Sequence, residues 1–197
     1  ASELHPPSDH LHSLVPYDLR LVADAYGRLG RVQEKRLDFQ NAERSCGAQV
    51  ALNLYLLDLS RSDAAGITDL TTADLQGLDR SALEALAIAY TNLGSVQQKL
   101  LEYQRAETSH LAGLHLTLYL AGFPGIDAAG IAGLTANDLC DLNRSALSHM
   151  ATAYRGLAAA QKHLKEHQKA AAANAAAAHL EEFLAKCSEG REVWPLQ

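Results

Sequence analysis

Apolar residues recur along most of the chain at the three- and four-residue intervals that are typical of helices. The clearest run is Leu83, Leu86, Tyr90, Leu93 and Leu100, and no stretch alternates as a surface strand would. The pattern therefore predicts an all-α protein. In the middle of the chain it predicts one helix near residues 82–100, a second near 103–121 and a short connector helix near 135–142.

The pattern repeats after 64 residues without a gap, so that Tyr26, Tyr90 and Tyr154 align. The connectors repeat too, because residues 63–83 match residues 127–147 at 14 of 21 positions. Similarity at a fixed period is the signature of arrays whose units bury their apolar faces against one another. We predict three units near residues 17–78, 79–142 and 143–186, which form one domain over residues 17–186. A flexible leader (1–16) precedes this domain and a tail (187–197) follows it.

Each unit carries an ordered set of aromatic, Leu-Gly, aromatic and Ala positions. In the second unit this set is Tyr90, Leu93-Gly94, Tyr103 and Ala106; in the first it is Tyr26, Leu29-Gly30, Phe39 and Ala42; in the third it is Tyr154, Leu157-Ala158, His167 and Ala170. The set resembles the tetratricopeptide repeat over about 34 residues of each unit. The resemblance implies stacked helical hairpins that bind other proteins. Two features depart from the family: Gln33, Gln97 and Gln161 replace an aromatic residue, and the usual turn glycine is missing.

The missing glycine leaves two folds open. Leu100-Leu101-Glu102 and Leu164-Lys165-Glu166 either form a turn or continue as helix, because propensity alone decides poorly between the two. The predicted fold class is a three-unit helical-hairpin repeat array. The alternative is a bundle of three long helices with short connector helices.

The connectors carry their own stop and start signals. Gly122, Pro124 and Gly125 predict the end of the preceding helix, and Thr135 with Asp138 predicts an N-cap. The first unit lacks this Gly and Pro, so its turn is assigned to residues 60–62 and Gly66. We expect Ile67 and Leu70, with their counterparts Ile131 and Leu134, to pack against the helices beside them.

Composition narrows the function classes. The chain has a net charge of -6 and no apolar run of 18 residues, so we expect a soluble protein without a membrane span or signal peptide. The acidic balance disfavours nucleic-acid binding. Cys46, Cys140 and Cys187 are odd in number and make no CxxC pair, which favours a reducing compartment such as the cytoplasm.

His163, Glu166 and His167 spell H-x-x-E-H, the inverted zinc-peptidase pattern. His167 aligns with Phe39 and Tyr103, however, and no third ligand is evident, so repeat packing explains the motif. The remaining histidines are dispersed, and His5, His10 and His12 fall in the leader. We predict no metal, no cofactor, no catalytic residue and no enzymatic activity.

Several exposed positions of the first helix in each unit are basic or polar. They are Arg28, Arg31, Lys35, Asn92, Ser95, Lys99, Arg155, Lys162 and His163. In tetratricopeptide repeats the exposed positions of the first helices line an inner groove, so the resemblance implies a groove here. Its Arg and Lys side chains would donate charge-assisted hydrogen bonds to carboxylates, which predicts an acidic segment of a protein or peptide as the partner. A solvated helix face is the alternative interpretation. The predicted function is a binding scaffold, followed by a self-assembling structural module and then by a helical metal protein or enzyme.

The last helix is unusually rich in alanine, from Ala170 to Ala178. Only the tail with Trp194 follows it, and arrays need covered ends. We expect that Trp194 plugs this end face, that the native chain continues, or that the face pairs with a second copy in a homo-oligomer.

Overall fold

The computed structural model describes residues 16–60, 62–140 and 142–188, and these residues form ten helices and no strand. Six long helices form three pairs: α2 (Pro16–Lys35) with α3 (Phe39–Leu56), α6 (Arg80–Lys99) with α7 (Tyr103–Leu120), and α10 (Arg144–His163) with α11 (His167–Ser188). Four short helices lie between the pairs: α4 (Ala64–Thr68), α5 (Thr72–Leu75), α8 (Ala128–Ala132) and α9 (Ala136–Cys140). The prediction of an all-helical chain is confirmed. The leader histidines and Trp194 lie outside the described residues.

A tight turn joins the two helices of each pair. Its central residue, Leu37, Leu101 or Lys165, has a φ of 62°, 64° or 64°, in the left-handed region. The next N–H donates to a carbonyl five residues back, as from Glu102 to Gln97 at 2.9 Å, which gives a Schellman motif without glycine. The alternative of three long helices is therefore wrong, since each helix reverses direction here.

The connectors end and begin helices largely as their sequences predict. Gly122 follows the end of α7 with a φ of 84°. In the first connector the corresponding residue is Asp58, with a φ of 58°, so the assignment of that turn to residues 60–62 and Gly66 was wrong. Aspartate is one of the few other residues that visit this region readily.

The predicted N-cap before α9 is confirmed by two hydrogen bonds. The Asp138 N–H donates to Thr135 Oγ1 at 3.4 Å, and the Thr135 N–H donates to Asp138 Oδ2 at 2.8 Å. Each connector holds two short helices rather than one. As expected, Ile67 and Ile131 are buried. The connectors thus cover the hairpins from the side.

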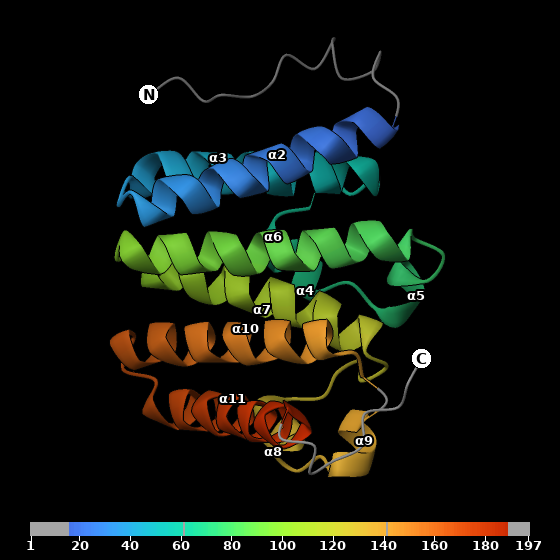
Figure 1. The fold of residues 1–197 in the computed structure, drawn as a ribbon, viewed down its shortest axis with the longest axis vertical. Helices are drawn as coiled ribbons and strands as arrows, with labels where there is room; N and C mark the ends of the chain where they lie inside the picture. Colours follow the sequence, from blue (N-terminus) through green and yellow to red (C-terminus); the bar gives the residue numbers. More distant parts are fainter. Residues whose placement is uncertain (1–15, 61, 141, 189–197) are drawn as a thin grey trace.

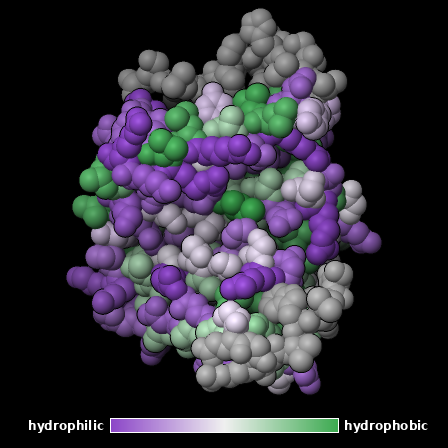
Figure 2. Space-filling model, in the orientation of Figure 1, coloured by the Kyte–Doolittle hydropathy of each residue, from purple (hydrophilic) through white to green (hydrophobic). Residues whose placement is uncertain are grey.

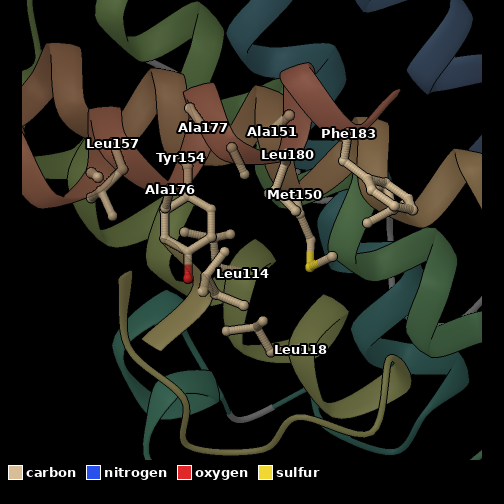
Figure 3. Close-up of a cluster of buried hydrophobic side chains, with 14 of the residues drawn as sticks. Leu114, Leu118, Met150, Ala151, Tyr154, Leu157, Ala176, Ala177, Leu180 and Phe183 are labelled. Atoms are coloured by element: carbon tan, nitrogen blue, oxygen red, sulfur yellow. The ribbon is translucent and has the colours of Figure 1, made fainter. Parts of the chain in front are cut away.

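The three hairpins lie one after another along the long axis of the molecule (Figure 1). Helix α3 packs on α6, and α7 packs on α10. The two largest apolar clusters lie mainly in the third and second hairpins with their connectors, and each also takes in residues of the preceding hairpin. Figure 3 shows one of them, in which Leu114 and Leu118 of α7 meet Tyr154 and Leu157 of α10. Each boundary therefore links the core of one hairpin to the hairpin before it. Among the described helices, none combines the length and apolar character that crossing a membrane requires.

Two of the glutamines that replace an aromatic residue, Gln33 and Gln97, are hydrogen-bonded inside their own hairpins. Gln97 is buried, and Ser109 Oγ donates to its Oε1 at 2.8 Å. Ser45 Oγ donates to Gln33 Oε1 at 2.7 Å in the first hairpin. The Gln–Ser pair links the two helices of the hairpin through satisfied polar groups, as burial requires.

Gly94 lets α6 and α7 approach closely. A Cβ at this position would lie 2.9 Å from the ring of His110, which is fully buried. Gly156 of α10 faces the same ring, and a Cβ there would lie 2.4 Å from it. Two glycines from adjacent hairpins therefore make room for one imidazole.

We expect Gly94→Leu to lower the free energy of unfolding by about 3 kcal/mol, because the side chain has no room beside His110. Ala158→Gly at the same position of the third hairpin should cost about 1 kcal/mol, mainly in helix propensity. Urea unfolding curves measure both changes. Equal losses in the two variants would show that close packing at Gly94 does not limit stability.

Candidate partner-binding surface

One face of each first helix carries an apolar ridge, and the preceding hairpin covers this ridge in α6 and α10. Tyr90 of α6 is only 2% exposed and Tyr154 of α10 only 3%. Within the described residues no hairpin precedes α2, and the corresponding Tyr26 is 38% exposed. We call Val22, Ala25, Tyr26, Leu29 and Val32 the open face of α2.

The open face of α2 carries exposed apolar residues at helical spacing. Val32 is 47% exposed, whereas Val96 at the same position of α6 is 1% exposed. Figure 2 shows hydrophobic side chains in its upper part, where Figure 1 places α2. Most large hydrophobic residues that are exposed in the described part of the chain lie on α2: Tyr17, Leu21, Val22, Tyr26, Leu29 and Val32. Grouped apolar residues mark interaction sites more often than single exposed residues do.

The two covered ridges show which chemistry fits this face. Leu114 and Leu118 of α7 belong to the cluster that buries Tyr154. Val50 and Leu54 of α3 belong to the cluster that buries Tyr90. The complementary surface is thus a helix with apolar side chains one turn apart.

Basic side chains lie along one edge of the open face of α2. Arg28, Arg31 and Lys35 are exposed. Arg28 and Arg31 also line a hollow of about 260 Å³ between α2, α3 and α6, together with Asp24 and Gln49. The structure thus brings together these two arginines from the predicted groove.

The predicted groove residues of α6 and Lys162 show no such cluster. Asn92 and Ser95 are half-buried, and Ser95 Oγ donates to the Thr91 carbonyl of its own helix at 3.0 Å. The Asn92 amide nitrogen is buried without an acceptor among the described residues. Lys99 and Lys162 are exposed near the ends of their helices.

Arg155 and His163 are exposed, and each contacts another side chain of the protein. Arg155 forms an ion pair with Glu181 of α11, its own hairpin partner. The His163 ring stacks on Tyr103, with centroids 4.0 Å apart and planes 6° apart. Both side chains are exposed, and their part in a groove of nine residues stays a prediction.

The repeat register explains the displacement of Arg155. Arg155 corresponds to Gly27 rather than to Arg28, and Lys162 corresponds to Glu34 rather than to Lys35. An offset of one residue turns a side chain by about 100° around a helix. All of these basic residues were expected to be exposed, so expected exposure could not distinguish Arg155 and Lys162 from residues in register with Arg28 and Lys35.

The zinc-peptidase interpretation of the H-x-x-E-H motif is wrong. His163 ends α10 and His167 begins α11, with the turn at Lys165 between them. The motif needs both histidines on one face of one helix. In the part of the chain that the structure describes, no three His, Cys, Asp or Glu side chains are grouped to hold a metal ion.

The other end of the stack differs from α2. On α11 the positions equivalent to the covering ridges of α3 and α7 are Asn174, Ala178 and Glu182, and all three are exposed. They are small or polar, so the expected apolar end face lies on α2 and not at the C-terminal helix. Self-association through α11 stays a prediction, without a large exposed apolar residue on that described helix to support it.

The sequence analysis did not predict the open face of α2, because it expected an uncovered apolar face only at the C-terminal unit. The signal was present in the repeat. Tyr26 aligns with Tyr90 and Tyr154, which predicts that the three tyrosines lie on the same ridge of their helices.

Comparisons of the chain with protein-family models, with curated proteins and with solved structures find no match. The open face of α2 and its basic edge are therefore the features that bear on function.

Proposed function

We propose that this chain is a protein-binding scaffold that holds an amphipathic helix of another protein on the open face of α2. One observation carries the proposal: of three tyrosines at the same repeat position, Tyr90 and Tyr154 are buried by a helix and Tyr26 is not. The same ridge packs against a helix in α6 and in α10, so the ridge of α2 is suited to bind one as well.

The hairpins are best interpreted as a tetratricopeptide-like array. The close approach of α6 and α7 at Gly94 supports this interpretation, as does the complete burial of Ala106. Arrays of this kind use exposed helix faces to bind other proteins. The scaffold function therefore agrees with the resemblance in sequence.

The contact between α7 and α10 indicates where charges of the partner would fall. His110 of α7 lies against Gly156, which occupies the position of Arg28 in its own helix. Tyr103 stacks on His163, which occupies the position of Lys35. A helix docked on α2 in the same way places its two corresponding residues beside Arg28 and Lys35.

Carboxylates at those two positions would form charge-assisted hydrogen bonds with the basic edge. The partner helix therefore carries an apolar ridge and two acidic residues seven positions apart. The expected acidic segment would thus bind beside Arg28 and Lys35, whereas Arg155 and His163 lie outside the proposed site.

A second copy of the chain fits the face less well. The covering ridge of α11 has Asn174, Ala178 and Glu182 where α7 has His110, Leu114 and Leu118. Pairing two α2 helices would place the cations of both copies beside the same apolar contact, where like charges repel. Another protein is the better occupant.

A labelled peptide tests the proposal. Its sequence is that of the 18 residues of α7, with Glu in place of Tyr103 and His110. We expect this peptide to bind the chain at least ten times more tightly than the unchanged α7 peptide, measured by fluorescence anisotropy. The difference should shrink in high salt, because screening weakens exposed charge pairs.

Two variants of the chain assign the binding to α2. Leu29→Glu should abolish binding of both peptides, whereas Leu101→Glu, at an exposed leucine in another hairpin turn, should leave binding unchanged. Arg28→Glu combined with Lys35→Glu should remove the preference for the acidic peptide. Binding that survives Leu29→Glu would contradict the proposal. A parent chain that sediments as a dimer and becomes monomeric on Leu29→Glu would instead make a second copy the occupant.

A further inference from the structure

A pocket of about 460 Å³ lies between the second and third hairpins, far in sequence from the open face of α2. Its walls come from α7, from the segment around α8, and from α10 and α11. Leu114, Leu118, Tyr154 and Leu157, which Figure 3 labels, belong to this lining. Volume and apolar walls fall in the range of small-molecule sites.

Two residues that line the same pocket each hold a buried polar atom without a hydrogen-bond partner among the described residues. Gln161 is only 4% exposed, and its Oε1 accepts no hydrogen bond from the described residues. His115 also lines the pocket, and its Nε2 is buried without a partner among these residues. Buried polar atoms normally have a hydrogen-bond partner. A ligand in the pocket could supply the partner that these two atoms lack.

The unpaired oxygen is specific to the third hairpin. In the first two hairpins, the hydroxyls of Ser45 and Ser109 donate to the oxygens of Gln33 and Gln97. Ala173 occupies the corresponding position in α11 and has no donor. Without a hydroxyl at this position, Gln161 Oε1 has no donor among the described residues.

The nitrogen of the Gln161 amide fixes the orientation of the group. Gln161 Nε2 donates to Glu107 Oε1 at 3.0 Å, so the carbonyl oxygen remains as the acceptor. Glu107 is buried, and its carboxylate disfavours an anionic ligand close to Gln161. Lys169 also lines the pocket, but its ammonium pairs with Glu166 at 3.0 Å. A neutral ligand suits this arrangement.

We infer that the pocket binds a small, neutral, largely apolar molecule whose hydroxyl or N–H group donates a hydrogen bond to Gln161 Oε1. The apolar walls bury the body of the ligand, and the single acceptor orients it. This site is separate from the proposed partner surface, and neither proposal depends on the other.

A matched pair of probes tests the inference on the full chain. 2-Naphthol carries a hydroxyl donor, whereas 2-methoxynaphthalene has the same rings and no donor. We expect 2-naphthol to bind at least ten times more tightly, measured by its fluorescence and by calorimetry. Equal affinities, or no binding of either compound, would overturn the inference.

Two variants keep the test independent of folding defects. Ala173→Ser restores the donor of the other hairpins, so it should abolish the preference for 2-naphthol without lowering the melting temperature. Ala172→Leu, at a half-buried pocket position, should reduce the affinity for both compounds at least tenfold. Leu29→Glu should change neither affinity. A preference for 2-naphthol that persists in Ala173→Ser would show that Gln161 is not the acceptor.

Discussion

Replacing Tyr154 with alanine is expected to lower the free energy of unfolding by about 3–5 kcal/mol, while Tyr26→Ala costs about 1 kcal/mol or less. The residue type and the repeat position are the same in both variants. Tyr154 is 3% exposed between α7 and α11, so its removal leaves a cavity that the packed helices cannot close. Tyr26 lies on the open face of α2 and is 38% exposed, so its removal leaves no enclosed cavity among the described residues.

Urea unfolding measures the two losses, and Tyr90→Ala provides the control because Tyr90 is buried like Tyr154. Its loss should match that of Tyr154→Ala. A second readout comes from titration: burial raises the pKa of Tyr154 to about 12, so its phenolate absorbance should appear at higher pH than that of exposed tyrosines. Equal losses for Tyr26 and Tyr154 would mean that a surface covers the open face of α2 in the free protein.

The helices were predictable because the apolar residues that are buried are also the residues that recur in the repeat. The expected helices near residues 82–100 and 103–121 correspond to α6 at 80–99 and α7 at 103–120. Apolar side chains such as Leu86 and Tyr90 recur at helical spacing since one face is covered. The same covering applies in the third hairpin, so the pattern returns 64 residues later.

The turns were not predictable from local preference. Leu101 and Lys165 adopt a left-handed backbone, which costs a side-chain-bearing residue about 1–2 kcal/mol. The Schellman hydrogen bonds and the packing of α6 on α7 offset this cost. Since the packing involves residues distant in sequence, Leu100-Leu101-Glu102 could not distinguish a turn from continued helix.

The binding surface was only partly predictable, for a similar reason. Arg28, Arg31 and Lys35 could be identified from their exposed positions on the helix. Tyr26 could not, because its exposure depends on whether another hairpin covers it. Arg155 lies one residue out of register with Arg28 and pairs with Glu181 of α11.

His110 was missed altogether, because a histidine among polar residues of α7 predicts an exposed side chain. The structure buries it completely between Gly94 and Gly156, and neither ring nitrogen has a hydrogen-bond partner among the described residues. The glycines leave enough space for the neutral ring. They supply no acceptor for an extra proton.

Acid should therefore destabilise the fold through His110. Burial lowers the pKa of His110 from 6.5 to about 4. Between these two values the unfolded chain binds the proton and the folded chain does not, so stability falls as the pH falls from 6.5 to about 4. Above pH 6.5 the contribution is constant. The full loss is about 3 kcal/mol, since each pKa unit corresponds to about 1.4 kcal/mol.

His110→Cys isolates this effect from the other titrating groups. The first hairpin has Cys46 at the same position against Gly30, and burial raises the pKa of that thiol to about 11, so a thiol at position 110 should stay neutral in acid. Other groups, such as His149, whose pKa burial also lowers, titrate in both proteins and cancel in the comparison. The parent should lose about 3 kcal/mol more than the variant between pH 7 and pH 4, measured by urea unfolding at intermediate pH values. A constant difference across this range would show that His110 can take up its proton inside the folded protein, which would require a water molecule or an acceptor to reach the ring between the two glycines.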